Sequence, residues 1–285
     1  MKLFTCITFH FRADKLAYLQ HVLSWQPRLA PSVQVALITN TVVEDELAAI
    51  AAVLPPPTDA FQCQIFNHGP QPLPSPWLLT WLHKPLMLKK YQDDPGTTHF
   101  MYLEDDHEIT PTNIAYWLEG REQLRPFGLY PSFLQVEWSA SQQEWTSVAL
   151  FNDEQVSIAR SPRLTTHDER AHYINLSKVY QGMFLYDREL MGEHIAAVSF
   201  DYSRYVPDLE ARFASSWGGG IAEAATDGLT FVNVPAGCHS RNFVPYFPKY
   251  RLLDPRCFVH HLPDKYANTP DSPFGHLPVR QILCP

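Results

Sequence analysis

The sequence lacks the long apolar runs that mark membrane proteins. No run approaches the roughly 18 residues that a membrane-spanning helix needs. The opening segment Met1–Phe9 is short and is followed at once by His10 and Arg12, which predicts a first strand rather than a secretory signal. We therefore expect a protein without a transmembrane segment, for which peripheral contact with a membrane stays open.

Cysteine is scarce and scattered. The five cysteines form no CxxC pair, and their number is odd, so the sequence suggests neither a disulfide framework nor a zinc ribbon. Reduced thiols and a cytoplasmic location are the simpler interpretation.

Basic residues are fewer than acidic residues. There are 22 Lys and Arg against 30 Asp and Glu, for a net charge of −8, and no basic block. This argues against a nucleic-acid partner, whose binding depends on a basic surface. The phosphate-binding patterns GxGxxG and GK[ST] are absent. The hydrophobic content of 45% nevertheless suffices for a substantial core.

Strand-like and helix-like segments alternate in the first half of the chain. Expected strands cover 2–9, 33–38, 62–66 and 98–103, and expected helices cover 13–25, 43–54, 76–91 (interrupted at Pro85) and 113–124. This alternation predicts an α/β, Rossmann-like protein with a mostly parallel central sheet flanked by helices. The second half is less regular, with expected strands at 132–137, 147–151, 179–186 and 229–234 and a helix at 187–198. Because there is no repeat or linker, we expect a single domain over 1–285, with halves 1–125 and 126–285.

Three consecutive acids, Glu104, Asp105 and Asp106, follow the apolar run Phe100–Leu103. Packed closely, such carboxylates repel one another unless a positive charge lies between them. A solvated acidic turn is one interpretation. The other is a divalent-metal site, because ligands of α/β sheets bind beyond the carboxyl ends of the strands and Mg²⁺ and Mn²⁺ take oxygen ligands.

The segment His99-Phe-Met-Tyr-Leu-Glu-Asp-Asp106 resembles the DxD metal motif of GT-A glycosyltransferases, some of which have Glu-Asp-Asp here. The resemblance implies a single GT-A-type domain with a nucleotide-sugar-binding half, 1–125, and an acceptor-binding half, 126–285. It implies that Asp106 binds Mn²⁺ or Mg²⁺, with Glu104 and Asp105 near the ribose and sugar. It also implies a nucleotide-diphosphate sugar as donor, with a UDP-sugar preferred, and transfer of a hexosyl or N-acetylhexosaminyl group. A glycan or lipid-linked glycan in polysaccharide biosynthesis would be the acceptor.

The same resemblance suggests further contacts with the nucleotide. The first strand and its turn would contribute Thr8, His10 and Arg12, although Arg12 could equally be a surface residue. The helix before the acids would contribute His83 and Lys84, for which simple solvation is the alternative. Lys265 would contact the diphosphate.

A histidine near the carboxyl terminus commonly completes the metal site of GT-A enzymes, and Cys257–Tyr266 contains His260 and His261. On a strand only one of the two can face a given site. We prefer His261, with a packed histidine pair as the alternative.

The segment Ser216–Asp227 places three glycines before two acids and resembles the WGGED-type acceptor segment of some galactosyltransferases, although its acids do not follow the glycines directly. Glu223 is the candidate general base and Asp227 the reserve. A carboxylate base is needed because a sugar hydroxyl has a pKa far above 7, and the resulting scheme is inverting. Gln181 and Gly182 could line the sugar pocket, as could Glu137 and Trp138.

Two other functions stay open at this point. A metal-dependent nucleotidyltransferase or phosphohydrolase would use the same carboxylates to direct attack on phosphorus. A non-catalytic carbohydrate-binding protein would account for the 13% aromatic content, although aromatic residues mostly build cores.

Overall fold

The structure, a computed structural model, describes residues 1–69, 73, 75–166, 171–176, 181–205 and 220–285. It divides the chain into two compact units. Unit 1 comprises Met1–His107 and Gly182–Val232, and unit 2 comprises Glu108–Gln181 and Asn233–Pro285. The chain changes unit at 107/108, 181/182 and 232/233, and the expected functional halves 1–125 and 126–285 stay predictions. A single domain over 1–285 stays a prediction.

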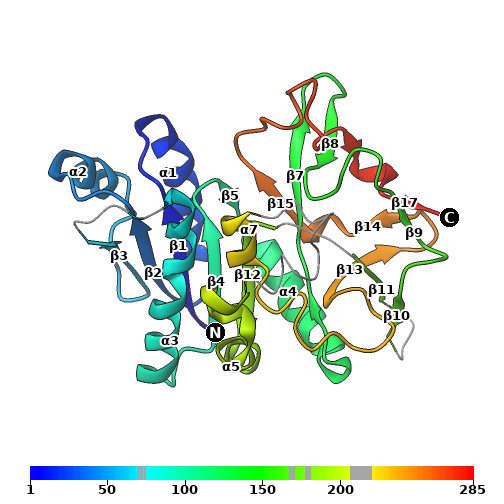
Figure 1. Ribbon diagram of the computed structural model, residues 1–285, viewed down its shortest axis with the longest axis horizontal. Helices are drawn as coiled ribbons and strands as arrows, with labels where there is room; N and C mark the ends of the chain where they lie inside the picture. Colours follow the sequence, from blue (N-terminus) through cyan, green and yellow to red (C-terminus); the bar gives the residue numbers. More distant parts are fainter. Residues whose placement is uncertain (70–72, 74, 167–170, 177–180, 206–219) are drawn as a thin grey trace. The chain divides into compact units, whose positions relative to one another are not determined.

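Unit 1 is built on a five-stranded sheet in the order β12-β4-β1-β2-β3 (Figure 1). Its parallel strands are β1 (Lys2–Phe9), β2 (Ser32–Thr39), β3 (Phe61–Asn67) and β4 (His99–Glu104). Strand β12 (Met183–Asp187) pairs with β4 in the antiparallel direction. The α/β class with a mostly parallel, helix-flanked sheet is therefore confirmed.

The central strands are apolar on both faces because helices cover the sheet. Residues 3–9 of β1 and 100–103 of β4 are all buried, as expected of strands in a parallel sheet with both faces covered. The helices of unit 1 include α1 (Leu16–Trp25), α2 (Glu44–Ala52), α3 (His83–Asp93), α5 (Arg188–Ala196) and α7 (Ile221–Thr226). Helix α3 packs on β1, α5 packs on β12 and β4, and α3 and α5 contact each other.

The strand order reverses next to β1. Strands β1, β2 and β3 follow one another toward one edge, and the chain then returns to place β4 on the other side of β1. In open α/β sheets such a reversal leaves a crevice at the carboxyl ends of the two strands, where ligands bind. Here these ends are Phe9 and Glu104, and Thr8 lies opposite Glu104 in the ladder.

Unit 2 has shorter strands in several sheets. One sheet has the order β10-β11-β13-β14, with β6 also paired to β13, a second has the order β16-β8-β7-β15-β5, and β9 pairs with β17. Their bounds are β5 (His107–Glu108), β6 (Tyr130–Pro131), β7 (Leu134–Ser139), β8 (Glu144–Ser147), β9 (Val156–Ser157), β10 (Arg163–Thr165), β11 (His172–Asn175), β13 (Asn242–Phe247), β14 (Leu252–Leu253), β15 (Phe258–His261), β16 (Leu277–Pro278) and β17 (Leu283–Cys284). Helix α4 (Pro111–Leu124) packs against β6.

Three of the expected elements differ from the structure. The expected strand 229–234 is wrong, because its backbone bonds locally: Thr230 N donates to Asp227 O at 2.8 Å and Val232 N donates to Leu229 O at 3.1 Å. The strand expected at 147–151 lies instead at Glu144–Ser147. The expected interruption at Pro85 is also wrong, because Pro85 lies in the first turn of α3, where its missing N–H is not needed. Positions 179 and 180 of another expected strand lie outside the described residues.

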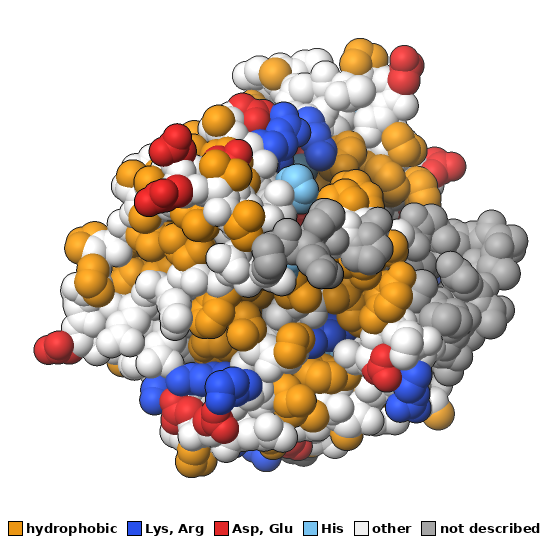
Figure 2. Space-filling view, turned by 60° about the vertical axis from the view of Figure 1, so that its left-hand side comes forward, with side chains coloured by type: hydrophobic (Ala, Val, Ile, Leu, Met, Phe, Trp, Pro, Cys, Tyr) orange, Lys and Arg blue, Asp and Glu red, His pale blue; other side chains and the backbone are white. Residues whose placement is uncertain are grey.

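Two surface properties bear on function. In the described part of the chain, no helix combines the length and the apolar character required to cross a bilayer. On the face shown in Figure 2, the coloured Lys and Arg side chains lie in small groups, several of them next to acidic side chains.

The amino end of α4 provides a test of the fold of unit 2. Thr110 and Pro111 occupy the N-cap and first helical positions, where these residue types are common. Asn113 Oδ1 accepts hydrogen bonds from Thr110 N at 2.9 Å and Thr110 Oγ1 at 2.7 Å. Asn113 Nδ2 donates to the carbonyl oxygens of Arg256 at 2.9 Å and Phe258 at 2.8 Å. This buried amide therefore joins the helix to the strand that carries His260 and His261.

We expect Asn113→Ala to lower the free energy of unfolding by about 2–3 kcal/mol, because it removes the cap and leaves two partly buried carbonyls without their donor. Thr112→Ala, at an exposed position of the same helical turn, should stay within about 0.5 kcal/mol of the parent. Urea denaturation measures both. Equal stability of the two variants would contradict this role of Asn113.

Candidate metal and nucleotide site

The end of β4 and the residues after it bring together three side chains that could bind a metal ion. Glu104, Asp106 and His107 each offer one ligand atom, and these atoms lie within 4.8 Å of one another. Asp106 and His107 are buried, Glu104 is half-buried, and His107 Nδ1 lies 3.0 Å from Asp106 Oδ1. Two carboxylates with one imidazole form a donor set suited to a divalent cation such as Mn²⁺.

Asp105 adds a buried charge without adequate compensation. Its Oδ2 atom is buried and has no hydrogen-bond partner among the described residues. Burial, followed by the charge of Asp106, raises the pKa of Asp105 to about 7, although Lys15 opposes this shift. The ammonium of Lys15 is 3.6 Å from Asp105 Oδ2 and 3.4 Å from Asp106 Oδ2. This buried oxygen has an ion pair with one ammonium but no hydrogen bond to a described residue, so the donor set beside it would suit a bound cation.

Gly182 makes room for His107. Glycine at this position has φ +59°, and a Cβ atom built there would lie 2.3 Å from His107 Nε2. The carbonyl of Gly182 also accepts a hydrogen bond from Glu104 N at 3.1 Å. Gly182 therefore contacts two of the three possible ligands, which gives this candidate from the sequence a concrete physical role.

The residues expected to hold the nucleotide lie at the carboxyl end of β1 and in the turn that follows it. Thr8 is buried, and its hydroxyl is 2.7 Å from Tyr102 Oη, whereas His10 and Arg12 are exposed. Arg12 pairs with Asp14 at 2.5 Å. Asn40 Oδ1 accepts a hydrogen bond from Phe11 N at 2.7 Å, which fixes the turn after β1. Contacts of these residues with a nucleotide stay predictions.

His83 and Lys84 lie in the interior of unit 1. The His83 ring is 4.2 Å from the Tyr102 ring. Lys84 Nζ donates to Ser199 O at 2.5 Å and lies 3.5 Å from the centre of the Trp81 ring. Burial lowers the pKa of both residues, because it disfavours their charged forms. Their observed partners are protein groups, and a role in nucleotide binding stays a prediction.

The two candidate bases are associated with α7. Asp227, which follows the helix, is buried and accepts a hydrogen bond from Tyr205 Oη at 3.1 Å. Burial raises the pKa of Asp227 to about 7, against the opposing effects of Tyr205 and Lys84. Glu223, within the helix, is half-buried. Trp81 Nε1 donates to Ile221 O at 2.7 Å and so anchors the start of α7. Of the preceding glycines, Gly218 and Gly219 lie outside the described residues.

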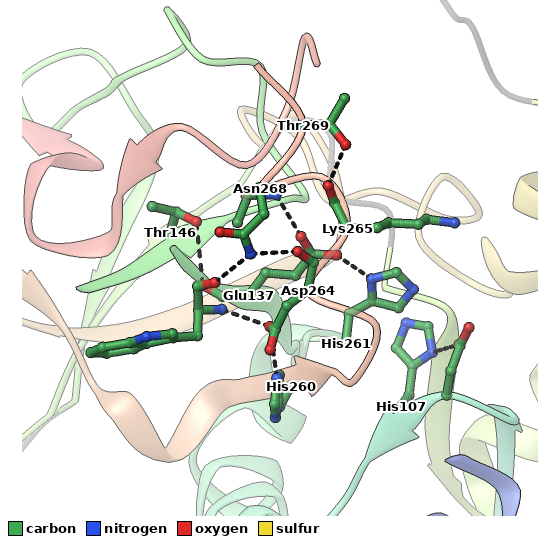
Figure 3. A network of polar contacts seen from close by, with 12 residues as sticks. His107, Glu137, Thr146, His260, His261, Asp264, Lys265, Asn268 and Thr269 are labelled. Carbon is green, nitrogen blue, oxygen red and sulfur yellow. Dashed lines mark hydrogen bonds and ion pairs between the residues drawn. The ribbon is translucent and has the colours of Figure 1, made fainter. Parts of the chain in front are cut away.

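The histidine pair lies in unit 2, on β15. His261 is buried, and its Nδ1 is hydrogen-bonded to Glu137, whose Oε2 accepts from Ala267 N at 2.7 Å. His260 instead bonds Asp264 Oδ1 through Nε2 at 2.9 Å. Figure 3 shows the two rings engaged by these different carboxylates. The two side chains therefore point to opposite faces of the strand and contact different carboxylates, as expected of adjacent residues in a strand.

Lys265 follows this strand and is exposed, with its Nζ atom 4.6 Å from the centre of the Tyr266 ring. Binding of a metal by His260 or His261, and of a diphosphate by Lys265, stay predictions.

Sequence reasoning missed His107 and Lys15. His107 directly follows the acidic triplet, so its position in the sequence could have indicated a further metal ligand. Lys15 is remote from the acids in sequence, and its position beside them depends on the parallel pairing of β1 with β4. Only the sheet topology could reveal it.

Together, these features define an α/β protein with a candidate cation site at the reversal of its strand order. No protein-family model matches the chain, and no curated protein matches it. Among solved structures it is similar to an active-site mutant of LgtC, a glycosyltransferase, at 12% sequence identity and a TM-score of 0.42. That match covers 90% of this chain and 86% of the LgtC chain.

We expect Gly182→Ala to weaken Mn²⁺ binding by about 10- to 100-fold, because the new methyl group must displace the His107 ring. Gly128→Ala is the matched control, because Gly128 has φ +68° and nothing within 4 Å of its built Cβ. Both variants meet the same backbone strain, but only the first touches a possible ligand. Isothermal calorimetry with Mn²⁺ compares them, and equal affinities would refute this role of Gly182.

The raised pKa of Asp227 predicts that the stability of the protein depends on pH. Below about pH 4 its carboxyl is protonated in both the folded and the unfolded chain. Between pH 4 and 7 the unfolded chain loses this proton first, because folding raises the pKa of Asp227 to about 7, so stability falls as pH rises. The loss should total about 2–4 kcal/mol and be absent in Asp227→Asn.

Denaturant unfolding at pH 4 to 8 measures this difference between Asp227→Asn and the parent. Glu44→Gln, at an exposed position of α2, is the control and should keep the pH profile of the parent. A profile for Asp227→Asn that parallels the parent would show that Asp227 does not cause the pH dependence.

Proposed function

We propose that this protein is a metal-dependent glycosyltransferase. It transfers a hexosyl or N-acetylhexosaminyl group from a nucleotide-diphosphate sugar, with a UDP-sugar as the preferred donor, to a hydroxyl of a glycan or lipid-linked glycan. One observation carries the proposal: Glu104, Asp106 and His107 converge at the carboxyl end of β4, beside the point where the strand order reverses. That edge is where α/β proteins bind nucleotides.

Glu104, Asp106 and His107 would hold the cation, and Thr8, His10 and Arg12 would line the nucleotide side of the same edge. When bound there, the cation would stabilise negative charge on the departing diphosphate. Asp105, buried beside Asp106, adds negative charge that favours a cation over a neutral ligand.

An inverting transfer also needs a base that takes the proton of the acceptor hydroxyl. Glu223 and Asp227 remain the two candidates. The pKa of about 7 for Asp227 suits a base at neutral pH, but this side chain is buried against Tyr205. Glu223 is less buried and is therefore the preferred base. Asp227 would then support the helix that carries Glu223.

A non-catalytic carbohydrate-binding protein is the second candidate. Trp138 and Trp145 pair across β7 and β8, with ring centres 5.5 Å apart in an edge-to-face arrangement. Each retains 36% of its exposure, so an aromatic surface is accessible to a ligand. Glycan binding that is unaffected by Asp106→Asn, with no donor consumed, would favour this function.

We expect Asp106→Asn to abolish sugar transfer and to weaken Mn²⁺-dependent binding of UDP by more than about tenfold, because a neutral amide replaces a charged ligand. The fold should survive, since the two side chains have nearly the same shape. Asp93→Asn, on the exposed end of α3, should bind and react like the parent.

Calorimetry of UDP, GDP, CMP and dTDP with Mn²⁺, and again with chelator, measures the binding. Affinities of the parent that are equal with metal and with chelator would refute the proposal. Release of pyrophosphate or phosphate without a glycoside would instead identify a nucleotidyltransferase or phosphohydrolase.

A further inference from the structure

Lys15 occupies the position of a cation at the acidic edge. It ends the short helix η1 (Ala13–Lys15), which follows the turn after β1. Its Nζ atom is 3.4 Å from Asp106 Oδ2 and 3.6 Å from Asp105 Oδ2. The two carboxylates are only 8–9% exposed, whereas the Lys15 side chain is 28% exposed. The ammonium therefore approaches this buried pair from the more open side.

One ammonium does not satisfy these acids. Asp105 Oδ2 is buried and makes no hydrogen bond to any described residue, so its separation of 3.6 Å from Lys15 is an ion pair alone. Glu104, Asp105 and Asp106 bring three carboxylates to this strand end, and His107 offers a nitrogen atom beside them. A divalent cation supplies more charge than Lys15 and can take several of these ligands at once.

We propose that Lys15 is a resident counter-cation that exchanges partners when the site fills. It pairs with Asp105 and Asp106 while the divalent cation is absent. The divalent cation displaces the ammonium from Asp106, and the freed ammonium then binds a phosphate oxygen of the nucleoside diphosphate. This inference rests on the proposed function and identifies a phosphate-binding residue for the same site.

Two properties make Lys15 suitable for this exchange. Its long flexible stem allows a charged end to change partners without movement of the backbone. Its neighbour Arg12 already pairs with Asp14, and that pair is 60–65% exposed. Lys15 is therefore the basic side chain of this turn that contacts the acids and would lose its partner when a divalent cation binds.

The exchange has opposite effects on the two ligands. In the parent protein Lys15 competes with the divalent cation for Asp106 and so weakens the binding of metal alone. Once metal is bound, the same ammonium attracts the diphosphate and strengthens nucleotide binding. A residue with only a structural role would weaken both or affect neither.

The test is calorimetry of Lys15→Met with Mn²⁺ alone and then with UDP at saturating Mn²⁺. We expect Mn²⁺ to bind about two- to tenfold more tightly than to the parent, and UDP about tenfold more weakly. Lys15→Gln gives a second measurement in case the first variant folds poorly, and Lys15→Arg should resemble the parent. Lys89→Met, at an exposed lysine of α3 that pairs with Asp93, is the matched control and should leave both affinities unchanged.

Opposite shifts for metal and nucleotide support the exchange. Two unchanged affinities, or two weakened ones, overturn it while leaving the proposed function intact, provided that the parent binds UDP in a metal-dependent way. A parent that binds neither Mn²⁺ nor UDP overturns both proposals.

Discussion

Crowded negative charge at the end of β4 is the constraint on which the rest of the site depends. Glu104, Asp105 and Asp106 follow a buried strand, and two of the three are themselves buried. Carboxylates in such a position are unfavourable unless positive charge reaches them. The protein meets this requirement in part with Lys15, and Asp105 Oδ2 remains without a hydrogen bond among the described residues. That residual imbalance is the reason that we propose a cation site at this strand end.

The surrounding structure of unit 1 keeps this strand end rigid. Strand β4 is held between β1 and β12, and the hydroxyl pair of Thr8 and Tyr102 links β1 to β4 within the core. Glycine at position 182 lets the backbone before β12 approach His107 closely. Rigid support of this kind positions ligands more precisely than a flexible acidic loop could. The same acids in a solvated turn would spread apart and bind a cation weakly.

A second set of buried charges has a different character. Lys84 and Asp227 lie in the interior of unit 1 and make their contacts with protein groups, Ser199 and Tyr205. The Lys84 bond ties α3 to Ser199, and the Tyr205 bond holds the end of α7. Burial shifts the pKa of each charged group in the direction that favours its neutral form. Burial alone therefore does not identify a ligand site. Their position directly after the carboxyl end of β4 distinguishes Asp105 and Asp106 from these interior charges.

The sequence by itself determined the class of fold and the location of the acids. Apolar residues recur with one period in strands and another in helices, so the sequence shows that strands and helices alternate, which predicts a parallel sheet. The acids come at the end of one of these strands. Tertiary structure decided which distant residues meet them. Lys15 reaches the acids because β1 pairs with β4, and His83 and Lys84 lie inside because α3 packs on β1. The segment 229–234 has strand-like residues but forms turns, since Leu229 N donates to Tyr186 Oη at 2.8 Å instead of to a neighbouring strand. The local sequence indicates whether a segment forms a helix or a strand. The partners of its side chains depend on packing between distant segments, which no single segment encodes.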